Sequence, residues 1–170
     1  IGAGVIGLEM GSIYSRLGTE ITILEFYDKV LNGMDHDISK NFKSILQKQG
    51  FKFHLSSSVS NIAKEKNGVK VTYKERDSDN SYELHADVVL VATGRKPFTE
   101  NLKLENIGVK INSKGQIETD KNWRTNTKNI FAIGDVTMGP MLAHKAEEEG
   151  IAVAEIIAGQ SGHVNFEVIP

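Results

Sequence analysis

The residues best suited to bind a phosphate stand at the start of the chain. Ile1–Gly7 reads IGAGVIG and contains the spacing Gly-x-Gly-x-x-Gly. In a dinucleotide-binding unit this turn joins the first strand to the first helix, and a pyrophosphate binds at the helix N-terminus. Gly2 permits the tight turn, Gly4 lets the phosphate approach the backbone, and Gly7 lets the helix pack against the sheet. The spacing alone is a weak signal, because glycine-rich turns are common.

A carboxylate at the end of the next strand-like run strengthens this interpretation. Glu25 closes the β-rich run Glu20–Glu25 and lies 18 residues after Gly7. A carboxylate there accepts both ribose hydroxyls of an adenosine and repels a 2′-phosphate. The residues that follow, Phe26–Lys29, contain no arginine to receive that phosphate. The alternative is an exposed acid at a strand end, but the order of strand, turn, helix and strand favours a site for NAD.

A second set of candidate residues lies in the C-terminal half. Asp135 follows the strand-like run Ile130–Ile133 and Gly134, at a position where open α/β sheets bind ligands. An ordinary Asp turn explains the same pattern. Met141–His144 begins a long helix, whose first amides lack backbone partners and suit an electron-rich carbonyl or ring. His144 itself, with no visible partner, is more typical of a surface or capping residue than of a catalyst.

Hydrophobic periodicity predicts the elements that position the first set. Apolar residues at helical spacing alternate with short β-rich runs in the order β-α-β-α-β, which implies a parallel sheet with right-handed crossovers. The expected elements are a helix over 6–17 with Ile6, Met10, Ile13, Tyr14 and Leu17 on one stripe, a strand over 20–25, a helix capped by Asp35 or Asp37 with Ile38, Phe42, Ile45 and Leu46 on one face, and a strand over 51–54. Glu9 is expected on the first helical turn, where an acid is favourable.

The next stretch predicts an antiparallel meander. Residues 58–66, 69–76 and 82–85 are β-like and are separated by Asn67-Gly68 and by the polar segment 77–81. Asp87–Ala92 then returns as a buried strand, and a sharp break at 93–97 indicates a domain boundary. Beyond a polar connector, the strand-like run 130–133 precedes a helix from about 142 to 158. We expect its core-facing residues to be Leu142, Ala146, Val153, Ala154 and Ile157, with Gly150 allowing close approach.

Composition limits the alternatives. The 170 residues carry a net charge of −2 with scattered Lys and Arg, so no nucleic-acid footprint is expected. No apolar run approaches a membrane span. The chain has no cysteine and no HExxH-like spacing, so neither disulfides, thiol catalysis nor a metal site is expected within it. Because the chain opens inside the turn and without Met, we expect it to be a piece of a longer protein.

Five segments together resemble one enzyme family. They read GAGVIGLE at 2–9, ILE at 23–25, ATGRKP at 92–97, TNTKNIFAIGD at 125–135 and GPMLAHKAEEEG at 139–150. In this order they resemble the dihydrolipoamide dehydrogenases, FAD-dependent members of the pyridine nucleotide-disulfide oxidoreductase family. The resemblance runs along essentially the whole chain. MLAHKAEEEG and the acid at 25 favour this group over NADPH-using relatives such as glutathione reductase.

The resemblance implies a domain and cofactor assignment. Residues 1–96 correspond to an NAD-binding domain and 97–170 to the C-terminal portion of an FAD-binding domain. Glu9 would also pair with a lysine beside the flavin, outside this chain. The NAD-binding residues would be Gly2, Ala3, Gly4, Val5, Ile6, Gly7, Leu8, Glu9, Glu25, Val59 and Gly94, and the FAD-binding residues Asp135, Met141, Leu142, Ala143 and His144.

The resemblance also implies parts that these residues do not contain. The family's redox cysteine pair and its catalytic His-Glu couple are expected outside this chain, so no catalytic residue is assigned within it. The implied partners are the dihydrolipoyl domains of 2-oxo acid dehydrogenase complexes and a second copy of the subunit. The implied location is the bacterial cytoplasm or the mitochondrial matrix. Two alternatives stay open: a glutathione- or mercuric-reductase-like enzyme, and an isolated dinucleotide-binding module without activity.

Overall fold

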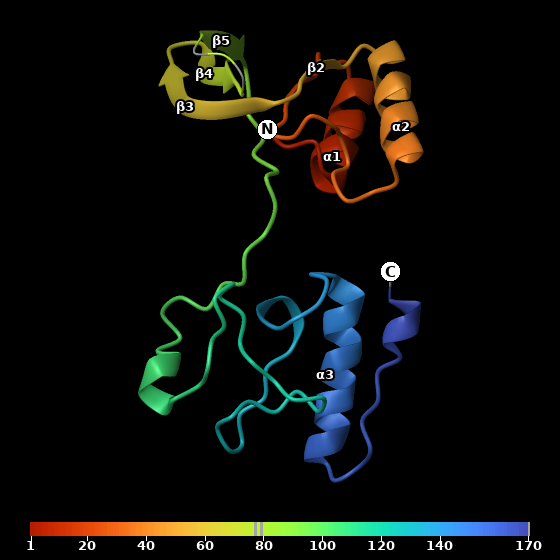
Figure 1. The fold of residues 1–170 in the computed structure, drawn as a ribbon, viewed down its shortest axis with the longest axis vertical. Coiled ribbons are helices and arrows are strands. Elements are labelled where there is room, and N and C mark those ends of the chain that lie inside the picture. Colours follow the sequence, from red (N-terminus) through yellow and green to blue (C-terminus); the bar gives the residue numbers. More distant parts are fainter. Residues whose placement is uncertain (77, 79, 170) are drawn as a thin grey trace. The chain divides into compact units, whose positions relative to one another are not determined.

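The chain forms two compact units, Ile1–Gly94 and Arg95–Pro170, in a computed structural model (Figure 1). The structure describes residues 1–76, 78 and 80–169. Within these described residues, the first unit contains a two-stranded parallel sheet and a three-stranded antiparallel sheet, together with two helices. The described part of the second unit contains one long helix and three short 3-10 turns. This architecture confirms the predicted α/β class.

Of the predicted β-α-β-α-β order, the described residues of the first unit contain the last four elements, α-β-α-β, and residues 1–3 are not assigned as a strand. Helix α1 (Val5–Arg16) leads to strand β1 (Thr22–Leu24), and helix α2 (His36–Lys48) leads to strand β2 (Lys52–His54). Strands β1 and β2 pair in parallel, with Ile23 opposite Phe53. Of the two predicted caps of α2, the structure selects Asp35, whose Oδ1 accepts from the amides of Asp37 at 2.9 Å and Ile38 at 3.2 Å.

The predicted meander is confirmed. Strands β3 (Ser57–Glu65), β4 (Gly68–Glu75) and β5 (Ser81–Ala86) form an antiparallel sheet in that order. Val71 and Tyr73 of β4 pack on Leu24 of β1 and join this sheet to the parallel pair. The predicted turn over 77–81 includes positions 77 and 79, which lie outside the described residues.

Two predicted strands are wrong. Asp87–Ala92 is neither a strand nor buried: Val88 is 81% exposed, and the segment is attached to Ile1, which donates to the Leu90 oxygen and accepts from the Ala92 amide. A strand needs a hydrogen-bonding partner over several residues, whereas Ile1 provides a partner of a single residue. The run 130–133 likewise forms a single bridge, between Phe131 and Arg124.

The apolar stripe of α1 is not the face that this helix buries. Leu8 and Gly11 are the buried residues of this helix, whereas Ile13, Tyr14 and Leu17 of the expected stripe are about half or more exposed. The physical reason is the close approach at Gly11: a Cβ there would lie 3.0 Å from the ring of Phe51. The helix therefore packs through its small residues and leaves its larger apolar side chains outside.

Glu9 does not lie on the first turn of α1. The helix begins at Val5, no acidic residue occupies its first turn, and the Glu9 side chain is exposed. The favourable helix-end interaction expected from the sequence falls off within the first turn, so it does not apply here.

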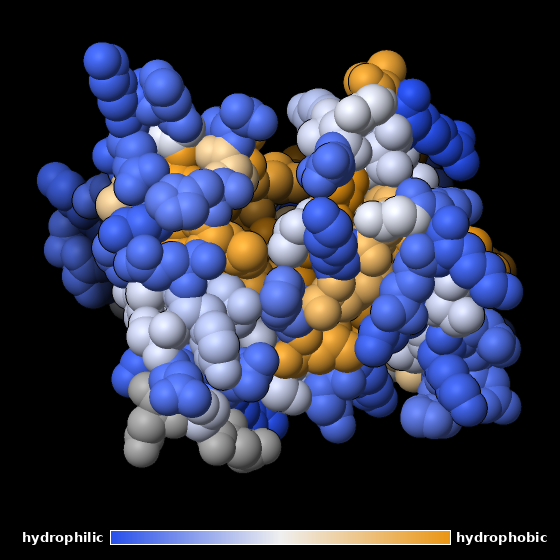
Figure 2. Space-filling model, turned by 90° about the horizontal axis from the view of Figure 1, so that it is seen from above, coloured by the Kyte–Doolittle hydropathy of each residue, from blue (hydrophilic) through white to orange (hydrophobic). Residues whose placement is uncertain are grey.

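Large apolar side chains remain exposed in both units. Figure 2 shows hydrophobic residues gathered between hydrophilic ones on the face that it presents. Exposed apolar surface of this kind is typical of faces that contact another molecule. The more exposed of these side chains include Leu17, Val88, Phe98, Met138, Ile157 and Val168.

The second unit is organised around helix α3 (Ala143–Ile157), preceded by the 3-10 turns η1 (Leu104–Ile107) and η2 (Gly134–Val136) and followed by η3 (Phe166–Val168). The helix was predicted, but its core face differs. Ala154 and Ile157 are exposed, and the buried positions of α3 are Lys145, Glu149, Ala152 and Val153. None of the described helices is long and apolar enough to cross a membrane.

Candidate functional site

The three glycines of the first turn differ in what surrounds them. Gly2 has φ +99°, and a Cβ there would collide with the Ala92 oxygen; a Cβ on Gly7 would collide with the Gly2 oxygen. Both positions therefore require glycine for the fold itself. Gly4 has φ −74°, and apart from its own chain neighbours no atom lies within 4 Å of the place that its Cβ would occupy. The open face of the turn therefore lies over Gly4, at the N-terminus of α1.

Backbone hydrogen bonds fix this turn to the first unit. The Gly2 amide donates to the Leu24 oxygen at 2.9 Å, and the Leu31 amide donates to the Ala3 oxygen at 2.9 Å. Ala3 is 1% exposed and belongs to the core around Leu8. The turn is thus attached to the core of the first unit through its own backbone.

Glu25 is buried beside this turn. Its residue is 8% exposed, its Oε2 accepts from the Ala3 amide at 2.5 Å, and its Oε1 accepts from the Tyr27 amide at 2.8 Å. The alternative of an exposed strand-end acid is therefore wrong. A carboxylate offers about four lone-pair sites, so each oxygen keeps acceptor capacity for a further donor. The residues present fit a ligand that brings hydroxyl donors to Glu25 and an anion to the open face at Gly4.

The remaining residues of the first predicted set have different environments. Leu8 is 1% exposed and belongs to the core, so its side chain cannot face a ligand, whereas Val5 and Ile6 are about half exposed. Val59 of β3 is half-buried and packs on the cluster around Leu24. Gly94 has φ +114°, and the space around its Cβ position is open. It lies two residues after Ala92, whose oxygen is packed against Gly2 of the turn.

Asp135 lies in η2 with its carboxylate accessible. Its side chain is 41% exposed, and its Oδ2 accepts from Arg95 Nη1 at 3.3 Å. Sequence reasoning did not assign Arg95 a role, although it stands in the ATGRKP segment. An accessible carboxylate fits a ligand with hydroxyl donors, such as a polyol chain.

The N-terminus of α3 lies in the same unit as Asp135. The N-cap residue is Leu142, and no side chain caps the helix. Its first amides therefore stay available to an acceptor on a ligand. Met141 and Leu142 are half-buried, and Ala143 and His144 are exposed.

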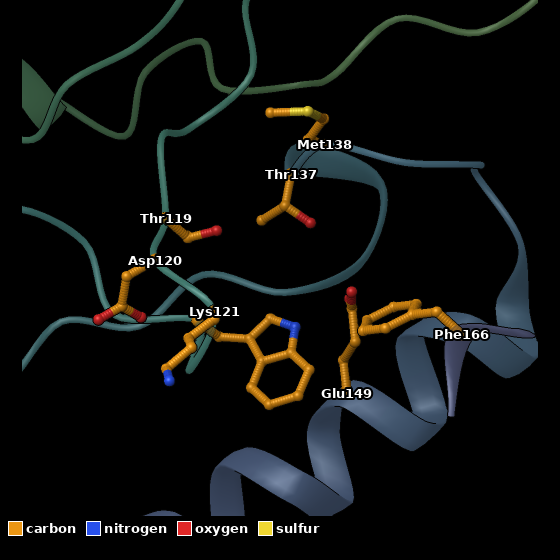
Figure 3. A pocket seen from close by; sticks show the side chains of 8 residues that line it. Thr119, Asp120, Lys121, Thr137, Met138, Glu149 and Phe166 are labelled. Carbon is orange, nitrogen blue, oxygen red and sulfur yellow. The ribbon is translucent and has the colours of Figure 1, made fainter. Parts of the chain in front are cut away.

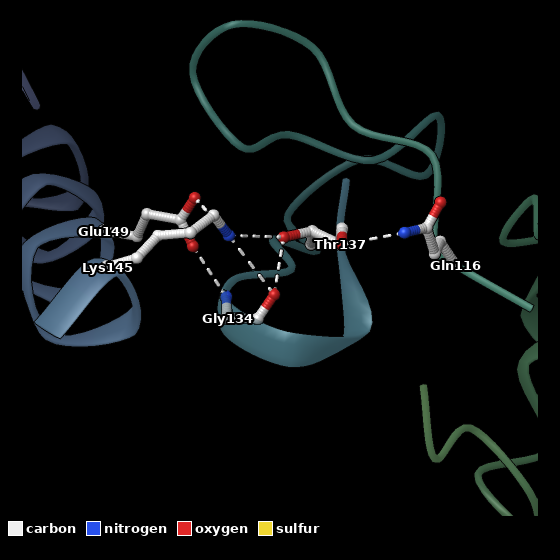
Figure 4. Close-up of polar contacts among 5 residues, drawn as sticks. All are labelled: Gln116, Gly134, Thr137, Lys145 and Glu149. Carbon is white, nitrogen blue, oxygen red and sulfur yellow. Dashed lines mark hydrogen bonds and ion pairs between the residues drawn. The ribbon is translucent and has the colours of Figure 1, made fainter. Parts of the chain in front are cut away.

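The structure also shows a buried ion pair that sequence reasoning missed. Lys145 Nζ and Glu149 Oε1 of α3 are 2.9 Å apart, and both side chains are at most 3% exposed (Figure 4). The spacing of four residues is the only sequence signal, and it is typical of exposed pairs on helices. Figure 4 shows both side chains directed toward Gly134 and Thr137 of the η2 turn.

A small pocket of about 140 Å³ lies next to this pair (Figure 3). Pockets for cofactor-sized ligands span about 300–1,000 Å³, so this one is too small to hold a dinucleotide. Its walls come from Thr119, Asp120, Lys121, Trp123, Thr137, Met138, Glu149 and Phe166.

Comparison with known proteins identifies the family. The model of the pyridine nucleotide-disulphide oxidoreductases matches residues 1–150. The chain is 48% identical over its whole length to dihydrolipoamide dehydrogenase of Chaetomium thermophilum and 47% identical to the mitochondrial dihydrolipoyl dehydrogenase of Rattus norvegicus. The chain belongs to the pyridine nucleotide-disulphide oxidoreductase family, whose members use FAD and NAD(P).

These matches cover nearly all of this chain but only about a third of each matched protein. The chain spans about a third of the length of both relatives, 34% in each case. Among solved structures, the HOCl-induced flavoprotein disulfide reductase RclA of Escherichia coli matches with a TM-score of 0.83 and 32% identity. That match covers 96% of this chain and 36% of the other.

Proposed function

We propose that this chain is the dinucleotide-binding part of a dihydrolipoyl dehydrogenase. The observation that carries the proposal is the identity of 47–48% along the whole chain to proteins of that name. In the proposed reaction a dihydrolipoyl dithiol is oxidised to a disulfide, and NAD+ is reduced to NADH with release of one proton. Bound FAD supplies the two-electron relay between thiols and nicotinamide.

The first unit is the proposed NAD-binding domain. The turn Gly2–Gly7 and the first residues of α1 would bind the pyrophosphate, since the turn is open over Gly4 and leads directly into the N-terminus of α1. Glu25 would accept the adenosine ribose hydroxyls with its free lone pairs while it continues to hold the Ala3 amide. Val59 and Gly94 would contact the same ligand. Glu9 would pair with a lysine that lies beside the flavin and outside this chain.

The second unit is the proposed C-terminal portion of an FAD-binding domain. Asp135 would accept hydrogen bonds from the ribityl chain, because its carboxylate is accessible and charged. Met141–His144 would place the uncapped N-terminus of α3 beside the flavin ring, where its amides stabilise electron density on a carbonyl oxygen.

The chemistry on sulfur requires groups that this chain lacks. It contains no cysteine, so the redox disulfide would come from another part of the protein, as would the acid-base couple that moves the thiol protons. His144 is not proposed for that role, since it stands at the start of α3 with the flavin-binding residues. The proposed partners are dihydrolipoyl domains of 2-oxo acid dehydrogenase complexes and a second copy of the subunit. A mitochondrial location is proposed from the relatives' names.

A direct assay of the full-length protein tests the proposal. The purified protein is expected to show flavin absorbance and to form NADH from dihydrolipoamide and NAD+. A flavoprotein that ignores dihydrolipoamide and reduces another disulfide or a metal ion would instead support the second candidate, to which the likeness to the reductase RclA points. A protein that binds no flavin would contradict both and leave a binding module.

A further inference from the structure

The buried pair Lys145–Glu149 has no part in the proposed function so far. Lysine and glutamate are almost never fully buried unless they are paired, and these two residues are 1% and 2% exposed. A buried ion pair is by itself weak evidence for stability, because apolar side chains of similar volume often replace it at no cost. What the pair contacts is therefore more informative than its presence.

The pair holds both main-chain polar groups of one residue. Glu149 Oε2 accepts from the Gly134 amide at 2.7 Å, and Lys145 Nζ donates to the Gly134 oxygen at 3.4 Å (Figure 4). Lys145 Nζ also donates to Thr137 Oγ1 at 3.5 Å, and that hydroxyl donates to the Gly134 oxygen at 2.8 Å. The two ends of the η2 turn are thus tied to α3 through buried side chains.

Packing tightens the same attachment. Gly134 has φ +72°, and a Cβ there would lie 3.1 Å from the Cβ of Ala146 on α3. The turn therefore rests directly on the helix. Gln116 Nε2 donates to the Thr137 oxygen at 3.4 Å and supports the turn from the other side.

The next residue after Gly134 is Asp135, and it faces outward. Its carboxylate is 41% exposed and contacts Arg95, so it does not take part in the buried network. Lys145 holds the Gly134 oxygen, which belongs to the peptide unit that Gly134 shares with Asp135, and Glu149 holds the Gly134 amide, which belongs to the unit before it. Together the two contacts fix the backbone on both sides of Gly134, and so the orientation of the unit from which the Asp135 side chain departs. A small rotation of that unit would displace the carboxylate from a ligand's hydroxyls.

We propose that Lys145 and Glu149 are positioning residues for flavin binding: they fix the η2 turn so that Asp135 is preorganised to accept hydrogen bonds from the polyol chain of FAD. This inference rests on the proposed function, since it assigns the ligand of Asp135 as FAD. It goes beyond that function by placing the determinant of flavin affinity in two buried residues that do not touch the ligand.

A matched pair of variants in the full-length protein tests the inference. Lys145→Met with Glu149→Leu removes both grips on Gly134 without leaving a lone buried charge, so the fold is expected to survive. Lys145→Met with Glu149→Gln has a carboxamide in place of the leucine side chain, whose oxygen can still accept from the Gly134 amide and whose NH2 group carries no charge. The dissociation constant of FAD, measured by titrating the apoprotein and following flavin fluorescence, is expected to rise about tenfold or more in the Met/Leu variant and to be largely restored in the Met/Gln variant.

One control and one milder variant separate positioning from general stability. Lys70→Met with Glu83→Leu removes an exposed ion pair of 3.0 Å in the first unit and is expected to leave the FAD constant unchanged. Thr137→Val removes the hydroxyl that joins Lys145 to Gly134. It is expected to raise the constant about threefold, and it provides a milder variant if the Met/Leu pair fails to fold.

A double-mutant cycle with Asp135→Asn gives the decisive readout. If the pair acts through Asp135, the Met/Leu variant changes FAD affinity much less when combined with Asp135→Asn than in the wild type. Equal effects in both backgrounds, or unchanged affinity in the Met/Leu and Thr137→Val variants, would overturn the inference while the proposed function stands. Failure of the unmutated protein to bind FAD would overturn the proposed function itself. Faster amide hydrogen exchange at residues 134–137 in the Met/Leu apoprotein would show that Lys145 and Glu149 hold the η2 turn in the absence of ligand, which would support the inference.

Discussion

Glu25 Oε2 accepts a hydrogen bond from the Ala3 amide at 2.5 Å, across 22 residues of sequence. The acid at the end of β1 therefore shapes the glycine turn before any ligand arrives. Its second oxygen accepts from the Tyr27 amide, so the carboxylate is fixed in direction as well as in place. A group held in this way loses little conformational entropy when it binds ribose hydroxyls. Removing it would change both the turn and the binding of the ligand, and a test must separate these effects.

Glu25→Gln is expected to weaken the preference of the full-length enzyme for NADH over NADPH by about tenfold or more. Glutamine loses the negative charge, and it keeps an acceptor oxygen for only one of the two backbone amides that Glu25 holds, those of Ala3 and Tyr27. Two like charges about 4 Å apart at an effective dielectric near 20 repel by about 4 kcal/mol before screening. The measurement is kcat/KM for both cofactors. Glu20→Gln, at an exposed carboxylate that pairs with Lys52 at 3.3 Å, is the matched control and should change neither value. Equal use of both cofactors by the unmutated enzyme would contradict the assignment.

Gly4→Val is expected to abolish NAD binding while flavin content and fold are retained. Apart from its chain neighbours, no atom lies within 4 Å of the Gly4 Cβ position, so the added side chain points into the space assigned to the pyrophosphate. The cost to the fold is limited to a poorer helix cap, about 1 kcal/mol. Gly7→Ala provides the contrast, because its Cβ would collide with the Gly2 oxygen and should lower the melting temperature sharply. Normal hydride transfer to NAD in Gly4→Val would show that the turn is only structural.

The local elements of this fold could be predicted from the sequence, since their signals are local. Asp35 caps α2 through its own side chain, and the short turn of Lys66 and Asn67, one residue before the predicted position, joins β3 and β4, which pair with each other. The strands predicted for 87–92 and 130–133 are wrong, because whether a strand forms depends on a partner elsewhere in the chain and not on a local signal. Their apolar runs are suited to strands, but a strand exists only where a partner supplies hydrogen bonds.

The buried faces of the helices could not be predicted from periodicity. On α1 the small residue Gly11, not the larger Ile13 or Leu17, meets the core. On α3 the buried face carries Lys145 and Glu149, which any hydropathy pattern places outside. Their burial depends on the polar groups of a turn that is distant in sequence. The sequence did indicate Glu25 and Asp135 as candidates, but not the side chains that hold their surroundings.

Tyr73 is expected to ionise only above pH 10. Burial raises the pKa of its phenol above 10, and the nearby Glu75 and Tyr82 add to the effect. The folded state keeps this proton at a pH where the unfolded chain has lost it. The resulting contribution to stability is therefore complete below pH 10 and is lost as the pH rises through the folded-state pKa. A difference titration of tyrosinate absorbance between the wild type and Tyr73→Phe measures it, and a difference signal centred at or below pH 10 would contradict the expectation.

Asp135→Ala is expected to release flavin from the full-length enzyme with little effect on NAD affinity or on thermal stability. A charge-assisted hydrogen bond to a ligand contributes about 1.5–3 kcal/mol, which corresponds to a loss of one to two orders of magnitude in flavin affinity. The fold should tolerate the change because the carboxylate is 41% exposed and its ion pair with Arg95 is on the surface, where such pairs contribute about 0–1 kcal/mol.

The ratio of flavin to protein absorbance after dilution measures this loss. Asp135→Asn is the matched variant: it retains one acceptor oxygen in the same position, so it should keep more flavin than Asp135→Ala and less than the wild type. If Asp135 only forms part of an ordinary turn, Asp135→Ala should lower the stability of the protein slightly and leave the flavin content stoichiometric. A flavin ratio in Asp135→Ala equal to that of the wild type would exclude Asp135 from flavin binding, because the turn that carries it is held by Gly134 and not by its own side chain.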